Sequence, residues 1–189
     1  GQKTGFYLDQ RDARLAVRTL SRGRRVTNLF SYSCAFGLSA AAGGAKAVLN
    51  VDASRPALDL GKKMFEENGF AAQDGIYGFE AVDVFKFLEA DPASLREGSG
   101  ENLLICDPPA FAKSASKLEA AKKAYIGLNR LCLESLSGGD IFVTSSCSGM
   151  LSEEAFRDLL RHASGWAKRN VRVLGSVSQP ADHTQTLSF

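Results

Sequence analysis

The stretch RRVTNLFSYSCAFGLSAAAGGAKAVLNVD, residues 24–52, decides the fold. Residues 24–30 predict a strand, residues 37–44 predict a short helix closed by glycines, and residues 45–52 predict a second strand. Successive strands joined by a helix are typical of a parallel sheet. The segment therefore predicts an α/β protein.

The same alternation of strands and helices continues along the chain. We expect further strands at residues 75–82, 102–107, 139–145 and 171–178, and helices at residues 55–69, 83–90, 116–136 and 152–170, with a surface loop at 91–101. Residues 141–145 are apolar enough to predict a buried strand. Mostly apolar strands indicate a parallel, twisted, doubly wound sheet with helices on both faces, where ligands bind at the carboxyl ends of the strands.

Length and composition are ordinary for one soluble domain. The chain has 189 residues, of which 44% are hydrophobic and 23% charged, and its apolar runs are too short to span a bilayer. The first residues lack the apolar segment of a signal peptide. The cysteines form no C-x-x-C pair and the histidines are isolated, so we expect free thiols, a cytoplasmic location and no metal site. These residues are Cys34, Cys106, Cys132, Cys147, His162 and His183.

The net charge of +2 is too weak by itself to indicate nucleic-acid binding. Arg11, Arg14, Arg18 and Arg22 nevertheless follow a 3-4-4 spacing, which places them on one face of a helix. This arginine stripe is either a solvated helix face or a surface that contacts RNA phosphates.

The first three strand ends suggest an adenosine ligand. The turn at residues 28–37 leads into a helix N-terminus, a common anion-binding place, but only Gly37 matches the G-x-G-x-x-G pattern of dinucleotide enzymes. Asp52 can accept both hydroxyls of a ribose, or can cap the next helix. Asp83 can bond an adenine amino group while Val84 or Phe85 covers the ring, or Asp83 can serve as a simple helix cap.

The fourth strand ends in DPPAF, residues 107–111. Two prolines after Asp107 hold the chain extended, and Phe111 supplies an aromatic ring. Such a turn is suited to hold a flat heterocycle beside a cofactor, or is only a rigid turn.

The fifth strand ends in SSCSGM, residues 145–150. Its Cys147 lies in a small-residue loop just before a helix N-terminus, which we expect to stabilise a thiolate. The other three cysteines are expected to be inert, because most free cysteines are buried.

Five segments together resemble a known family. GQKTGFYLDQRDAR, NLFSYSCAFGLSAAAGGA, DPPAF, SSCSGM and QPADHT are similar to the RlmI-like family over essentially the whole chain. Its members are class I S-adenosylmethionine-dependent methyltransferases, with a Rossmann-like fold, that form 5-methylcytosine in 23S ribosomal RNA.

The resemblance implies roles for individual residues. Cys147 is expected to add to carbon 6 of a flipped-out cytosine, which makes carbon 5 nucleophilic, while Asp107 supports ring nitrogen 3. The residues expected to hold S-adenosylmethionine are Lys3, Thr4, Phe6, Phe30, Ser31, Tyr32, Asp52, Ala53, Asp83, Val84 and Asp107.

The resemblance also predicts the domain organisation. Residues 1–189 are expected to form the catalytic domain, with residues 1–23 flanking cofactor and RNA, while a PUA-type RNA-binding module and a last antiparallel strand lie outside this sequence. Three alternatives stay open: a class I methyltransferase for another base or a small molecule, a non-catalytic domain that binds S-adenosylmethionine, and an NAD enzyme, which the missing glycines disfavour.

Overall fold

The protein folds as an α/β domain, described by a computed structural model over residues 7–70, 75–90, 95, 98, 100–111, 115–178 and 180–182. Within these ranges no helix is both long and apolar enough to cross a lipid bilayer. The elements are η1 (Leu8–Gln10), α1 (Arg11–Leu20), β1 (Arg25–Leu29), α2 (Ala35–Ala42), β2 (Ala47–Asp52), α3 (Arg55–Glu67), β3 (Tyr77–Ala81), α4 (Val84–Glu89), β4 (Asn102–Cys106), η3 (Ala115–Lys117), α5 (Leu118–Glu134), β5 (Ile141–Thr144) and α6 (Glu153–Trp166).

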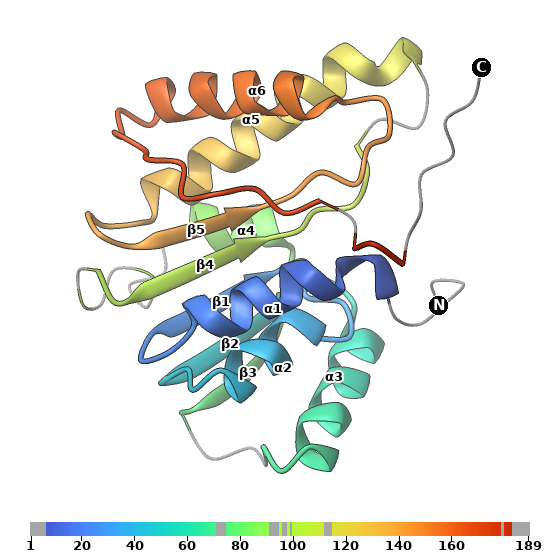
Figure 1. Ribbon diagram of the computed structural model, residues 1–189, viewed down its shortest axis with the longest axis vertical. Helices are drawn as coiled ribbons and strands as arrows, with labels where there is room; N and C mark the ends of the chain where they lie inside the picture. The colour runs from blue at the N-terminus through green and yellow to red at the C-terminus, as the bar shows by residue number, and fades with distance from the viewer. Residues whose placement is uncertain are drawn as a thin grey trace.

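The described strands form one parallel sheet in the order β3-β2-β1-β4-β5 (Figure 1). Leu29, the last residue of β1, is in register with Val51 of β2 and with Cys106 of β4. The strand order reverses between β1 and β4, which makes their carboxyl ends the switch point where parallel sheets bind ligands. The predicted fold class and sheet direction are confirmed.

Three helices begin at the side-chain caps that the sequence contains. Ser54 accepts a hydrogen bond from the backbone N–H of Ala57 at 3.4 Å, with a proline in the first turn of α3. Asp83 and Ser152 accept in the same way at the starts of α4 and α6. Such caps pair amide groups that have no partner inside a helix.

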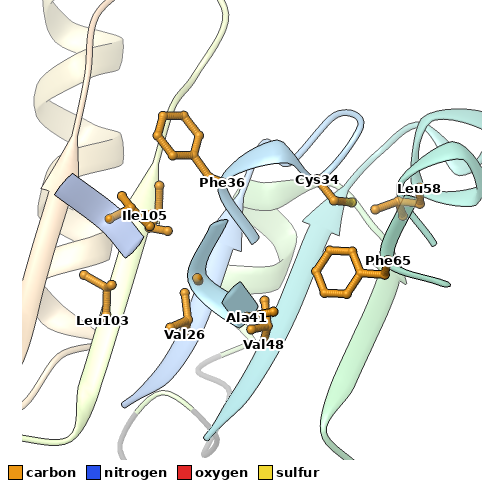
Figure 2. Close-up of a cluster of buried hydrophobic side chains, with 11 residues drawn as sticks. Val26, Cys34, Phe36, Ala41, Val48, Leu58, Phe65, Leu103 and Ile105 are labelled. Atoms are coloured by element: carbon orange, nitrogen blue, oxygen red, sulfur yellow. The ribbon is translucent and has the colours of Figure 1, made fainter. Parts of the chain in front are cut away.

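Two hydrophobic cores hold the helices on opposite faces of the sheet. The first joins α1, α2 and α3 to the strands, and Figure 2 shows Phe65, Leu58 and Val48 within it. The second joins α4 and α5 to the other face. Burying one such side chain stabilises the fold by about 1.5–3 kcal/mol. Gly37 lets α2 approach β2 closely, because a Cβ atom there would lie 2.0 Å from Oδ1 of Asn50.

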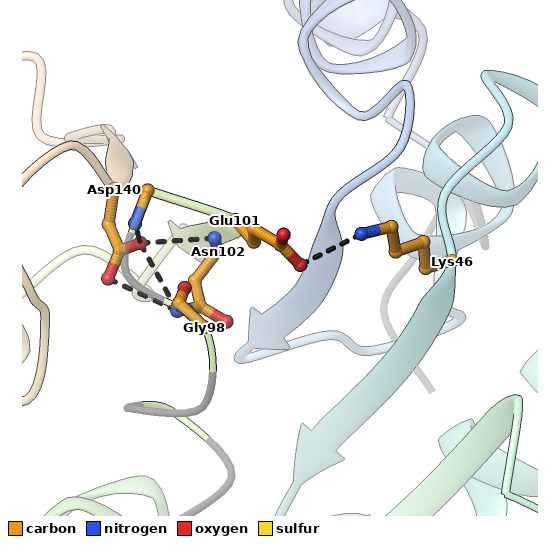
Figure 3. Close-up of polar contacts among 6 residues, drawn as sticks. Lys46, Gly98, Glu101, Asn102 and Asp140 are labelled. Carbon is orange, nitrogen blue, oxygen red and sulfur yellow. Dashed lines mark hydrogen bonds and ion pairs between the residues drawn. The ribbon is translucent and has the colours of Figure 1, made fainter.

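The carboxylate of Asp140 links the amino-terminal ends of β4 and β5 through hydrogen bonds. Asp140 Oδ1 accepts from the backbone N–H groups of Gly100 at 3.0 Å and Asn102 at 3.1 Å, and Oδ2 accepts from the N–H of Ser137 at 2.8 Å. The side-chain amide of Asn102 also donates to Asp140 and to the carbonyl of Gly98 (Figure 3). Asp140 thus satisfies several backbone donors that would otherwise be unpaired.

We expect Asp140→Ala to lower the free energy of unfolding by about 2–4 kcal/mol, because partly buried donors lose their acceptor. Urea titration measures this change. Glu101→Ala is the neighbouring control: its ion pair with Lys46 is solvent-exposed, so the urea midpoint should stay almost unchanged. Equal effects of the two substitutions would contradict the proposed importance of Asp140.

Three predicted features differ from the structure. Residues 171–178 are extended but pair with none of the described strands, and Val173 and Leu174 are 68% and 75% exposed, so the predicted last strand is absent from this part of the chain (Figure 1). Favourable composition cannot form a strand without a ladder partner. Strand β5 forms as predicted but is half-buried, because it lies at an edge of the described sheet. Helix α6 also ends earlier than predicted, at Trp166.

Candidate active site

The turn after β1 has an unusual backbone. Phe30, Tyr32 and Cys34 adopt left-handed φ angles of 55°, 47° and 62°, a conformation that costs a non-glycine residue about 1 kcal/mol or more. Hydrogen bonds offset this cost: the N–H of Ser31 donates to the Val51 carbonyl at 3.0 Å, and that of Cys34 to the Ser31 carbonyl at 2.7 Å. The turn is therefore held in one shape at the switch point.

Asp52 connects this turn to the tip of β2. Its Oδ2 accepts from the backbone N–H of Tyr32 at 2.8 Å, and its Oδ1 accepts from the N–H of Ser54 at 2.8 Å. Each oxygen retains a further lone pair that can accept from a ligand hydroxyl. Asp83, at the tip of β3, caps α4 by accepting from the N–H of Lys86 at 3.1 Å and is solvent-exposed.

Asp107 lies at the carboxyl end of β4 and is surrounded by hydrogen-bond donors. Its Oδ2 accepts from Nε2 of Gln10 at 2.8 Å. Its Oδ1 accepts from the hydroxyl of Ser145, and the Cys147 thiol points at the same oxygen with Sγ 3.8 Å away. The structure thus brings together the two predicted catalytic residues, from segments 40 residues apart.

Aromatic packing supports the loop that carries Cys147. Ser146 donates from its hydroxyl to the hydroxyl of Tyr125 at 3.1 Å. The Tyr125 ring is buried between Phe111, at a centroid distance of 4.7 Å, and Phe156, at 5.8 Å. Phe111 therefore forms part of the wall behind the loop, while the Cys147 side chain reaches solvent.

The surroundings of Cys147 disfavour the thiolate form of its side chain. Desolvation by the surrounding protein, and then the charge of Asp107, raise its pKa to about 12. The expectation that the following helix stabilises a thiolate is wrong: α6 begins only at Glu153, and a carboxylate lies much closer to the sulfur. The helix field falls off within its first turn. The proton on Cys147 must therefore be removed during any reaction that uses this sulfur.

A comparison of this sequence with the profiles of known protein families identifies its family. The profile of the S-adenosylmethionine-dependent methyltransferases matches residues 1–159. The chain belongs to this family. S-adenosylmethionine is therefore its cofactor.

Similar methyltransferases include a ribosomal RNA large subunit methyltransferase I from Serratia proteamaculans, 42% identical over 97% of this chain and 45% of the relative. Another, from Vibrio cholerae, is 39% identical over 100% of this chain and 47% of the relative. The chain spans about half the length of the curated relatives it matches.

Two solved structures have the same fold. A methyltransferase complexed with SAH superimposes with a TM-score of 0.82 and 29% identity, over 99% of this chain and 47% of that one. A SAM-dependent methyltransferase from Streptococcus mutans gives a TM-score of 0.80 and 29% identity, over 96% of this chain and 46% of that one. The Rossmann-like methyltransferase fold is thereby confirmed.

The remaining predicted cofactor residues differ in position. Lys3, Thr4 and Phe6 lie outside the described residues. Ala53 is exposed after β2, whereas Val84 is only 2% exposed and packs in the second core. The roles of these residues stay predictions.

Sequence reasoning about this methyltransferase missed Gln10, Ser145 and Tyr125. Gln10 lies inside the opening motif and Ser145 is two residues before Cys147, so closeness to a recognised motif was the available signal. For Tyr125 no sequence signal existed beyond helical spacing, because its hydroxyl accepts the hydrogen bond from Ser146 only in the folded protein. Tyr7 also lies near the site, where desolvation and then Cys147 raise its pKa.

The arginine stripe is partly occupied by internal contacts. Arg11 pairs with Asp12 and with Asp182, and Arg14 donates to the carbonyl of Tyr7 at 2.6 Å. Arg11, Arg14 and Arg18 nevertheless line one surface hollow of about 350 Å³. The predicted common helix face is therefore confirmed for these three arginines, and Arg22 is exposed one turn further on.

Proposed function

We propose that residues 1–189 form the catalytic domain of a cytoplasmic enzyme that methylates carbon 5 of cytosine in 23S ribosomal RNA, through a transient bond between Cys147 and the base. The pairing of Cys147 with Asp107 at the switch point of a methyltransferase fold carries this proposal. The names of the relatives, which are large-subunit ribosomal RNA methyltransferases, support the choice of substrate.

The first step is addition of sulfur to the base. Because the pKa of Cys147 is raised to about 12, the thiol approaches the cytosine with its proton. Asp107 Oδ1, 3.8 Å from Sγ, accepts this proton as the bond between sulfur and carbon 6 forms. The electron pair displaced from the carbon 5–carbon 6 bond moves towards nitrogen 3, and Asp107 returns the proton there. The product is a neutral, enamine-like ring.

Methylation then follows at carbon 5. S-adenosylmethionine, when bound, supplies an electrophilic methyl group to this carbon. Residues of the strained turn and Asp52 are suited to hold the methionine and ribose parts, and Asp83 the adenine. Loss of the carbon-5 proton to solvent then expels the Cys147 sulfur as a thiolate, which takes back the proton held at nitrogen 3, so that a neutral aromatic 5-methylcytosine and the free thiol are restored.

The direct test is transfer of labelled methyl from S-adenosylmethionine to naked and partly assembled 23S RNA. Digestion to nucleosides and mass spectrometry should place the label in 5-methylcytidine. Label in another nucleoside, or in a small molecule alone, would favour a different class I methyltransferase. Binding of S-adenosylmethionine without any acceptor would favour a non-catalytic role.

We further propose that the arginine stripe contacts RNA phosphates. Combined replacement of Arg18 and Arg22 by alanine should weaken RNA binding and reduce the slope of log K against log salt by about 0.7 for each phosphate that is no longer neutralised. Filter binding across a salt series measures both effects. Alanines at Lys62 and Lys63, exposed on α3, are the matched control and should leave the slope unchanged. An unchanged slope in the arginine variant would mean that the stripe is a solvated face.

A further inference from the structure

Gln10 connects the N-terminal segment to the reacting groups. Its side-chain amide donates to Oδ2 of Asp107 at 2.8 Å, across 97 residues of sequence, and both side chains are half-buried. The other oxygen of Asp107 faces Ser145 and Cys147. The two carboxylate oxygens therefore have separate partners, one on the N-terminal segment and one on the loop that carries the thiol.

The hydrogen bond between Gln10 and Asp107 is separate from the hydrogen bonds that begin α1. Gln10 is the residue immediately before the first turn of α1, where side chains usually cap the helix. Its side chain makes no capping hydrogen bond. Glutamine is not among the preferred capping residues, so its amide is available for the long-range contact with Asp107.

Tyr7, three residues before Gln10, is held in place by two contacts. Arg14 donates to the carbonyl of Tyr7 at 2.6 Å, and the Tyr7 ring packs edge-on against Tyr32 at a centroid distance of 6.3 Å. Tyr7 directly precedes η1 and Gln10 is the last residue of this single tight turn, so holding Tyr7 at one end limits the movement of Gln10 at the other. The contacts of Tyr7 therefore restrict the turn that carries Gln10, whose side-chain amide donates to Asp107.

We propose that Gln10 is a positioning residue, whose amide fixes the plane of the Asp107 carboxylate so that Oδ1 faces the Cys147 sulfur. This inference rests on the proposed function. Rotation of a carboxylate about its last side-chain bond is soft, and donors to Oδ1 alone would leave the position of Oδ2, and with it the carboxylate plane, less well defined. Donors on both oxygens define it, which keeps the proton acceptor aligned with the thiol.

The test uses two variants of the same length as glutamine. Gln10→Met removes the donor and should lower kcat about 10- to 100-fold, with the KM for RNA and the affinity for S-adenosylmethionine nearly unchanged. Gln10→Glu should be at least as slow at a pH of about 8, because two carboxylates then repel each other. As the pH falls to about 6, the introduced glutamate, whose charged form is disfavoured beside another carboxylate, takes up a proton and can donate again. The kcat of Gln10→Glu should therefore rise relative to that of Gln10→Met as the pH falls.

The readout is the rate of covalent adduct formation with RNA that contains 5-fluorocytosine, together with kcat. If the unmodified protein forms no adduct, the proposed function itself fails. If it does form the adduct and Gln10→Met forms it equally fast, the positioning role is overturned. Loss of S-adenosylmethionine affinity in Gln10→Met, or parallel pH profiles for the two variants, would also overturn it, because either result indicates a general structural role.

Discussion

Cys147→Ala should lower methyl transfer to 23S RNA by about 10⁴-fold or more, because no other group can form the bond to carbon 6. Cys147 is exposed whereas Cys34, Cys106 and Cys132 are buried, so no second thiol can substitute for it. Radiolabelled methyl transfer at saturating S-adenosylmethionine measures the loss. Calorimetry should show that the variant still binds S-adenosylmethionine, which separates loss of chemistry from loss of folding.

The unmodified protein provides an internal control for this prediction. With 5-fluorocytosine RNA and S-adenosylmethionine, it should accumulate a covalent complex that resists denaturation, and peptide mass spectrometry should locate the bond at Cys147. The alanine variant should form none. A complex mapped to another residue, or turnover by Cys147→Ala at the parent rate, would contradict the thiol mechanism.

Asp107→Asn should have the second-largest effect and should change two measurements in opposite directions. Methyl transfer should fall about 10²- to 10⁴-fold, because an amide cannot relay the proton from the thiol to nitrogen 3. Alkylation of Cys147 by iodoacetamide should become faster. The reason is that the Asp107 charge contributes, after desolvation, to the raised pKa of this thiol, and the amide removes that charge.

Peptide mapping after a short iodoacetamide pulse at constant pH measures this alkylation, and the three buried cysteines serve as internal references. Ser145→Ala is the matched comparison, because it removes another partner of Asp107 without changing the charge. Slower alkylation together with slower methyl transfer in Asp107→Asn would indicate that the loop has collapsed and would contradict the assigned role.

Much of the fold was predictable because its signals are local. The alternation of apolar strands with helices predicted the parallel sheet, and Asp83, a possible cap in the sequence, begins a helix in the structure. Residues 171–178 show the limit of such signals. Their composition suits a strand, but whether a strand forms depends on a neighbouring strand, which local sequence does not specify.

The sequence by itself determined the parallel α/β architecture and placed Asp52, Asp107 and Cys147 at strand ends, because strands joined by helical crossovers run parallel and their carboxyl ends meet at one edge of the sheet. Only the tertiary structure decided the hydrogen-bond partners of Asp107 and the raised pKa of the Cys147 thiol. The partners of Asp107 come from Gln10 and from the loop after β5, and the same carboxylate helps to keep the Cys147 thiol protonated. A pKa depends on the charges and solvent that surround a group in space, and folding alone brings those together.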